Sequence, residues 1–201
     1  MNSTSTTPQI GRPREFDRDA VVNAVVDLFW EQGFAATSIG DVVERTGLSK
    51  SSLYGAFGSL DARFRTALDR YLADHRSSIE STLLHGEQGL ADIDAFFDRI
   101  GDQLEQLGER RGCLLVNTST ELGITEPSIS EFGARHRTTL RKGFAAALER
   151  ASSSGEFDPD RIANTVNVLV STVLGLAVMI RGGAEIDEVR LHLESAKGSL
   201  R

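Results

Sequence analysis

The chain has 201 residues, of which 40% are hydrophobic, so it can bury a sizeable core in one large domain or in a small domain joined to a larger one. Its net charge of −7 argues against indiscriminate nucleic-acid binding over the whole surface. Its single cysteine excludes an internal disulfide framework and favours a reduced, cytoplasmic location.

The composition of two segments argues against an export signal and a membrane span. The first residues, MNSTSTTPQ, lack the apolar stretch of a signal peptide and predict a disordered leader. The longest apolar run, residues 168–180, is shorter than the roughly 20 residues of a membrane span. We therefore expect a buried or interface helix there and no membrane association.

The N-terminal part reads as a series of helices. Apolar residues spaced for one helical face predict a helix over residues 16–33, capped by Asp17 and ended by Gly33. Three more helices are expected: from residue 37 or 38 to the glycine at 47, from the serine at 49 to about 57, and from the serine at 59 onward. This order of helices, with a glycine-containing turn, is that of a helix-turn-helix.

The segment TGLSKSSLYGAF supplies the second helix of this motif, which enters the major groove in DNA-binding proteins. Leu53 and Phe57 are spaced to anchor it, which leaves Lys50, Ser51 and Ser52 pointing outward at its N-terminal end. Serine hydroxyls and a helix N-terminus can contact bases and phosphates there. An ordinary corner between two solvated helices explains the same spacing.

A longer stretch, LFWEQGFAATSIGDVVERTGLSKSSLYGAF, resembles the DNA-binding domain of the TetR family of bacterial transcription regulators. The resemblance covers about the first third of the chain. It implies an all-α fold in which residues 1–15 form a flexible basic arm, residues 16–58 form the helix-turn-helix domain, and residues 59–201 form a larger helical domain for ligand binding and dimerisation.

The resemblance also implies which residues contact DNA. The chain departs from the family pattern at two positions. The family usually has a lysine where this chain has Leu60, and often a polar or basic residue where it has Gly55. Arg63 or Arg65 would have to supply the missing contacts with the DNA backbone. The arginines of the arm can equally be a solvated tail. The expected DNA-contacting residues are Arg12, Arg14, Thr37, Ser38, Ser49, Lys50, Ser51, Ser52 and Tyr54.

The larger C-terminal part contains candidates for a small-molecule site, which is typically apolar with a few polar groups. The segment ADIDAFFDRIGDQLEQLGER presents an apolar face that includes two phenylalanines, and Asn117 and Glu121 lie one helical turn apart. The polar pair borders a pocket or faces water, and three further candidates, Phe132, His136 and Met179, are equally well explained as core. The expected ligand-binding residues are Phe96, Phe97, Ile100, Leu104, Asn117, Glu121, Phe132, His136 and Met179.

Cys113 follows two arginines and a glycine and is expected to begin a helix, which would lower the pKa of its thiol. It is therefore a candidate redox or electrophile sensor. The alternative is a small buried hydrophobic residue.

The last two predicted helices begin near residues 159 and 186. The resemblance implies that they pair with their copies in a four-helix dimer interface, and the alternative is that they only close the core of the monomer. The expected interface residues are Val166, Val170, Val173, Gly175, Val189 and Leu193.

An enzyme is the rival class of function. The sequence has no G-x-S-x-G motif and no glycine-rich phosphate loop, and its four histidines, His75, His85, His136 and His192, are scattered without metal-ligand spacing. We therefore expect no catalytic set, no metal and no cofactor. The expected function is a homodimeric repressor that binds a double-stranded DNA operator and is released by a small molecule; the remaining alternatives are sensing through Cys113 and a helical adaptor that does not bind DNA.

Overall fold

The computed structural model describes residues 16–107 and 111–201, and every regular element in these two ranges is helical, as expected. The elements are α1 (Arg18–Gln32), α2 (Ile39–Thr46), α3 (Lys50–Phe57), α4 (Leu60–Ile79), the π-helical turn η1 (Glu80–Leu84), α5 (Leu90–Leu107), α6 (Leu114–Leu122), α7 (Pro127–Ser153), the 3₁₀ turn η2 (Pro159–Arg161), α8 (Ile162–Arg181) and α9 (Ile186–Gly198).

The first four helices begin where short-range capping predicts. The Asp17 carboxylate accepts the N–H groups of Asp19 and Ala20 at the start of α1. The remaining three helices start at serines that cap them in the same manner, Ser38, Ser49 and Ser59. Each cap satisfies backbone donors that the first helical turn leaves unpaired, so the chain alone specifies these starts.

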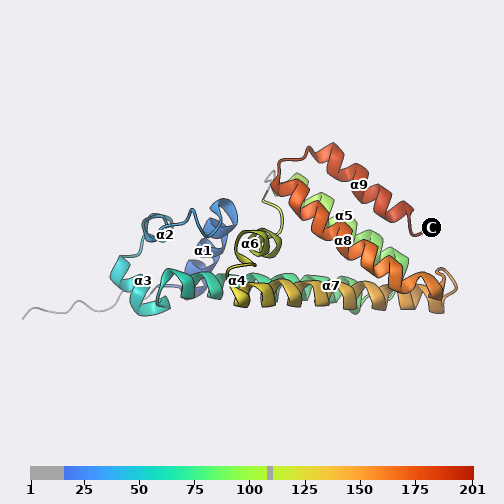
Figure 1. The fold of residues 1–201 in the computed structure, drawn as a ribbon, viewed down its shortest axis with the longest axis horizontal. Coiled ribbons are helices and arrows are strands. Elements are labelled where there is room, and N and C mark those ends of the chain that lie inside the picture. The colour runs from blue at the N-terminus through green and yellow to red at the C-terminus, as the bar shows by residue number, and fades with distance from the viewer. Residues whose placement is uncertain (1–15, 108–110) are drawn as a thin grey trace, which may run out of the picture.

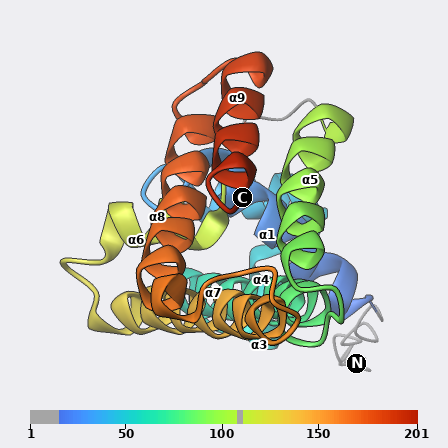
Figure 2. The same cartoon turned by 90° about the vertical axis from the view of Figure 1, so that its right-hand side faces the viewer.

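Two long helices form the base of the molecule (Figure 1). α4 leaves the helix-turn-helix end and runs beside α7 in the same direction, as the contacts of Arg65 with Ser128 near one end and of Arg150 with the carbonyl of Leu84 near the other show. α5 and α8 stand on this layer, and α9 packs between them on the side away from the layer (Figures 1 and 2). α6 lies between this group and the helix-turn-helix end, so it connects the two ends of the molecule.

The buried side chains form two clusters. One joins α5, α7, α8 and α9 with the end of α4. The other fills the helix-turn-helix end but also includes Leu114 and Leu115 of α6 and Ile129 and Phe132 of α7. The core of the N-terminal end is therefore completed by residues that lie more than fifty positions further along the chain.

α8 has two different faces. By length and composition, Pro159–Arg181 could cross a membrane, a test that the core helix of a folded domain also passes. One face of α8, including Leu169 and Leu176, is buried in the larger cluster, whereas Val168 and Val178 are 56% and 52% exposed. The helix thus packs in the protein on one side and leaves apolar side chains uncovered on the other.

Candidate functional site

The N-terminal end of α3 presents a polar surface. Ser49 Oγ accepts the backbone N–H of Ser52 at 3.1 Å and lies 2.9 Å from the hydroxyl oxygens of both Ser51 and Ser52. Leu53 is fully buried beneath them, while Lys50 is exposed at the first helical position. Three hydroxyls and one ammonium group are therefore held at the positive end of a helix, where anions bind favourably.

Tyr54 extends the same surface, because its side chain is 52% exposed. Its ring lies under the guanidinium of Arg63, at 5.0 Å from ring centroid to guanidinium carbon. Stacking on Arg63 therefore holds the Tyr54 ring, and with it the phenol hydroxyl, on the exposed side of α3.

Thr37 and Ser38 lie at the start of α2, and the structure separates them. Ser38 is exposed and forms a reciprocal capping box with Asp41. Thr37 is 5% exposed, and its hydroxyl donates to the carbonyl of Gly33 at 2.6 Å. The expected phosphate contact of Thr37 is therefore corrected: its hydroxyl is already used to brace the turn between α1 and α2.

Four arginines were candidates for contacts with the DNA backbone. Arg12 and Arg14 lie outside the described residues. Arg63 is 2% exposed, so it cannot compensate for Leu60 by reaching a phosphate. Arg65 is paired with Asp61 in an i, i+4 ion pair.

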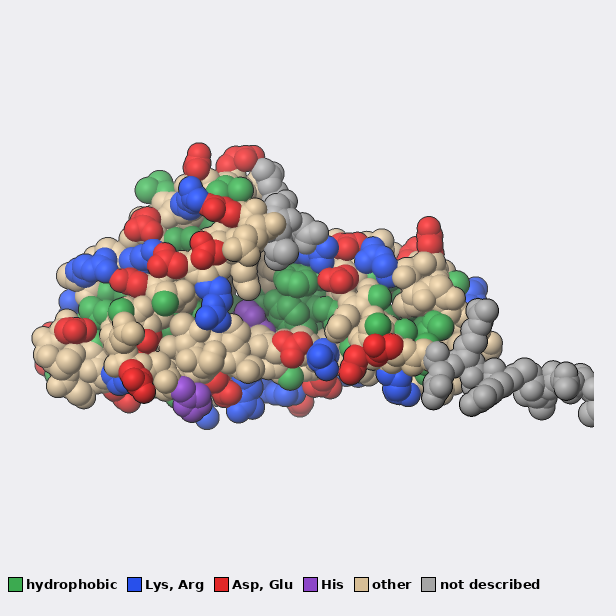
Figure 3. Space-filling model, turned by 180° about the vertical axis from the view of Figure 1, so that it is seen from behind, with side chains coloured by type: hydrophobic (Ala, Val, Ile, Leu, Met, Phe, Trp, Pro, Cys, Tyr) green, Lys and Arg blue, Asp and Glu red, His purple; other side chains and the backbone are tan. Residues whose placement is uncertain are grey.

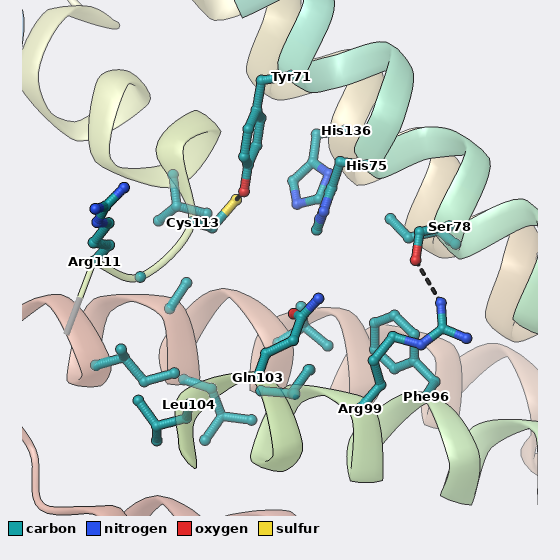
Figure 4. A pocket seen from close by; sticks show the side chains of 18 of the residues that line it. Tyr71, His75, Ser78, Phe96, Arg99, Gln103, Leu104, Arg111, Cys113 and His136 are labelled. Atoms are coloured by element: carbon teal, nitrogen blue, oxygen red, sulfur yellow. Dashed lines mark hydrogen bonds between the residues drawn. The ribbon is translucent and has the colours of Figure 1, made fainter. Parts of the chain in front are cut away.

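A cavity of about 330 Å³ lies between α4, α5, α6, α7 and α8. Figure 3 shows it as a hollow in which hydrophobic side chains and a histidine are visible from outside. Its apolar wall is Phe96, Ile100, Leu104, Val173, Leu176 and Ile180. Its polar side includes Asp74 and the residues labelled in Figure 4: Tyr71, His75, Ser78, Arg99, Gln103, Arg111, Cys113 and His136.

Four of the nine expected ligand-binding residues line this cavity: Phe96, Ile100, Leu104 and His136. Phe97 does not, because it is fully buried in the core against the ring of Phe144. Phe132 packs in the cluster of the helix-turn-helix end, and Met179 on α8 is not among the lining residues.

The polar pair on α6 also lies outside the cavity. Asn117 Nδ2 donates to the carbonyl of Arg111 at 2.8 Å. The Glu121 carboxylate accepts the backbone N–H groups of Phe34 and Ala35 at 3.2 and 2.7 Å. The expectation of a polar handle for a ligand is therefore corrected: Asn117 orders the start of α6, and Glu121 fastens α6 to the turn after α1.

The cavity contains polar residues that the sequence did not single out. Tyr71, His75 and Ser78 recur along one face of α4, a spacing that could have indicated a polar stripe on an otherwise core-facing helix. The Tyr71 hydroxyl donates to Cys113 Sγ at 3.8 Å, and the rings of Tyr71 and His75 stack at 5.4 Å between centroids.

Burial controls the charge of these groups. It lowers the pKa of His75 to about 4, and burial together with the positive charges of His75 and Arg137 lowers the pKa of His136 to about 3, so both imidazoles are neutral at pH 7. Burial also raises the pKa of the Cys113 thiol, and the nearby amide of Val116 offsets only part of that rise. The expected low thiol pKa of Cys113 is therefore wrong, because burial outweighs the helix start.

The expected interface residues need a similar correction. Val166, Val170 and Val173 on α8 are buried in the core of the single chain, as are Val189 and Leu193 on α9. These five close the monomer, the alternative that the sequence left open.

Gly175 is the exception, because it lies on the exposed face of α8 and a β-carbon added there would meet no atom within 4 Å. Val168, Val178 and, on α9, Leu191 at 67% exposure are the large apolar side chains that these two helices leave uncovered.

Two family models match the chain. Residues 21–62 match the model described as "Bacterial regulatory proteins, tetR family", and residues 89–193 match "Tetracyclin repressor-like, C-terminal domain". The first range contains the helix-turn-helix, and the second contains α5 to α8 with most of α9.

Curated relatives match over most of their length. The HTH-type transcriptional repressor ComR of Escherichia coli (strain K12) is 29% identical over 187 residues, which cover 89% of this chain and 86% of ComR. The HTH-type transcriptional repressor Rv3405c of Mycobacterium tuberculosis is 30% identical over 179 residues, which cover 80% of this chain and 90% of the relative.

Solved structures share the fold. A cysteine mutant of the TetR family transcriptional regulator CifR, complexed with 26bp double-strand operator DNA, superposes with a TM-score of 0.80 at 23% identity, covering 95% of this chain and all of that one. The reduced form of E. coli NemR gives a TM-score of 0.77 at 20% identity, covering 90% and 95% of the two chains.

Proposed function

Because this chain belongs to the TetR family, whose members are DNA-binding transcription regulators and not enzymes, we propose that it is a homodimeric repressor released from its operator by an effector. ComR and Rv3405c are called repressors, and the CifR structure contains operator DNA. The observation that carries the proposal is the exposed polar end of α3, where Lys50 and three serines surround a helix N-terminus.

The DNA-contacting set of the proposal is smaller than the sequence predicted. Among the described residues it comprises Ser38, Lys50, Ser51, Ser52 and Tyr54, which are exposed, and the arm outside them would add Arg12 and Arg14. Ser49 serves mainly to cap α3. Residues 16–58 are the reading domain in this proposal, residues 1–15 are its arm, and the protein acts inside the cell, where its DNA target lies.

Effector binding is proposed to occur in the cavity, which combines an apolar wall with a polar side. α4 carries the reading domain at one end and lines the cavity with Tyr71, His75 and Ser78. An effector that favours one position of α4 over another shifts the distance between the two reading domains of a dimer, and so their fit to two half-sites.

Operator binding tests the proposal. The probe is double-stranded DNA from upstream of the protein's own gene, titrated at several salt concentrations, because phosphate contacts release counterions and contacts with a protein partner need not. We expect Lys50→Ala to weaken binding and to reduce the slope of log K against log salt by about 1. Tyr54→Phe is expected to cost about 0.5–1.5 kcal/mol of binding free energy through one lost hydrogen bond.

The matched control is Lys142→Ala, which removes an exposed lysine from α7. Both test variants are expected to keep the melting temperature of the wild type, because their side chains are exposed. Operator affinity that is unchanged in both, or equally reduced in the Lys142 control, would contradict the role of α3. The absence of salt-dependent binding to this DNA would favour the adaptor alternative, which does not bind DNA.

A further inference from the structure

Three side chains that are far apart in the sequence meet on the polar side of the cavity. His75 comes from α4, Cys113 immediately precedes α6, and His136 comes from α7 (Figure 4). One potential ligand atom from each residue, an imidazole nitrogen or the thiol sulfur, lies within 4.8 Å of the other two. Two of the four histidines that seemed scattered in the sequence thus form a cluster with the only cysteine of the chain.

His136 is the anomalous member of this cluster. Its side chain is 2% exposed, and neither Nδ1 nor Nε2 has a hydrogen-bond partner among the described residues. A buried polar group without a partner costs free energy, and native structures seldom keep one without a reason. The ring faces His75, at 5.1 Å between centroids, and both line the cavity.

The donor set defines the class of ligand. Two neutral imidazoles and one thiol suit ions that accept both nitrogen and sulfur, and the set lacks the carboxylates that Mg²⁺ and Ca²⁺ require. We propose that His75, Cys113 and His136 bind a thiophilic d¹⁰ metal ion, Zn²⁺ or Cu⁺, and that this ion is the effector of the cavity. On binding, the Cys113 thiol gives its proton to solvent and its sulfur bonds to the metal as thiolate.

The geometry requires a small closing movement. With Zn–S near 2.3 Å and Zn–N near 2.0–2.1 Å, ligand atoms around one ion lie about 3.3–3.8 Å apart. The three side chains must therefore approach one another by about 1 Å. The Tyr71 hydroxyl already donates to Cys113 Sγ and is placed to stabilise the thiolate once it forms.

This movement would be felt at the DNA-binding end. The carbonyl of Gly112, next to Cys113, accepts Trp30 Nε1 of α1 at 3.0 Å, and Arg111 pairs with Asp27 of α1 at 3.0 Å. Drawing Cys113 toward α4 and α7 therefore pulls on the segment that holds α1. This regulatory step rests on the proposed function, whereas metal binding itself does not.

Metal binding is tested on the full chain after treatment with a chelator and a reductant. Zn²⁺ is titrated by calorimetry, Cu⁺ by anaerobic competition with a chromophoric chelator, and Co²⁺ is added as an optical probe. We expect one ion per chain and a thiolate-to-Co²⁺ charge-transfer band in the near ultraviolet. The ion that binds this site and changes operator affinity identifies the effector.

Variants test the ligand set. Tyr71→Phe removes a hydrogen bond to a metal ligand and should weaken metal binding by about 10–100-fold. Cys113→Ser and His136→Gln remove ligands themselves and should weaken metal binding by more than that. His192→Gln, an exposed histidine of α9, is the matched control and should bind as the wild type does. Circular dichroism of the metal-free proteins checks that each variant is folded.

Each outcome bears on one step. A wild-type protein without the charge-transfer band, or metal affinity that is equal in wild type and Cys113→Ser, overturns the site. Metal that binds through these residues without changing operator affinity at least severalfold overturns the regulatory step alone. A metal-free protein that binds no upstream DNA contradicts the proposed function, and the optical and calorimetric results still decide the metal site.

Discussion

His75 and His136 are two imidazoles kept neutral by their surroundings. Their depressed pKa values, about 4 and about 3, mean that the folded chain resists protonation at pH values where the unfolded chain, with histidine near 6.5, takes up protons. The stability that depends on these groups is therefore complete above pH 6.5. It is lost progressively as the pH falls from 6.5 through 4 and toward 3.

This linkage gives a prediction for the metal-free protein. The free energy of unfolding, measured by urea denaturation between pH 7 and pH 4.5, should fall more steeply in the wild type than in the double variant His75→Gln/His136→Gln. Carboxylates with lowered pKa, such as Glu31 beside Arg45, add a loss of the same sign to both proteins, so the difference isolates the two histidines. The control is His85→Gln/His192→Gln, whose side chains are exposed. Parallel curves for the wild type and the cavity variant would contradict the assignment of both histidines as buried and neutral.

At the level of whole elements, α3 is held at its C-terminal end by α4. Arg63 Nη1 donates to the carbonyl of Leu53 within α3 at 3.1 Å and to that of Gly58, the C-cap residue of the helix. A positive charge there also suits the negative end of the helix dipole. Arg63 of α4 therefore fixes the C-terminal end of α3, the helix that is proposed to contact DNA. The same helix α4 lines the cavity.

Arg63→Ala should therefore destabilise the fold by about 1.5–3 kcal/mol, the range for hydrogen bonds that involve a charged group. Arg70→Ala, further along the same helix, removes exposed ion pairs with Asp19 and Asp74 and should cost about 0–1 kcal/mol. Chemical denaturation of both variants measures the two values. Equal losses would show that Arg63 contributes no more than a surface charge.

The helix starts at Asp17, Ser38 and Ser49 could be predicted, because each cap and its amide lie within three residues. The partner of Glu121 could not, because it lies 86 residues away on the turn after α1. For the same reason, the spacing of Asn117 and Glu121 predicted that they share one face of a helix, but it could not predict which residues that face contacts.

The sequence predicted one side of the cavity and missed most of the other. The apolar wall on α5 follows from helical periodicity. The same periodicity also assigned Phe97 to this wall. Phe97 follows Phe96 by one residue, and this rotation about the helix axis turns its side chain into the core. The cluster of His75, Cys113 and His136 depends on how three helices pack, which no local pattern records.

For the molecule as a whole, α8 has an apolar face that no described residue of the single chain covers. Val168 and Val178 flank Gly175 on this face, and a helix with small residues allows a second copy to approach closely. We expect the dimer interface to use this face and the exposed side of α9, instead of the five buried residues that the sequence indicated.

Gly175→Glu tests this arrangement, because the added side chain meets no atom of the same chain within 4 Å of its β-carbon. The monomer should fold as before, but the buried charge should prevent dimerisation and so abolish binding to a two-half-site operator. Sedimentation velocity gives the oligomeric state. Ile124→Glu, at a fully exposed apolar residue after α6, is the control and should remain dimeric. A dimeric Gly175→Glu protein with normal operator binding would place the interface elsewhere.

Trp30 gives the molecule a built-in optical reporter. It is the only tryptophan of the chain, and its indole lines the cavity, meets Tyr71 edge-on at 5.0 Å and bonds through Nε1 to Gly112. All tryptophan fluorescence of the protein therefore originates where α1 meets the cavity. Any occupant that quenches or shifts this emission can be titrated on the unlabelled protein, and the same signal follows the movement of α1 when DNA is added.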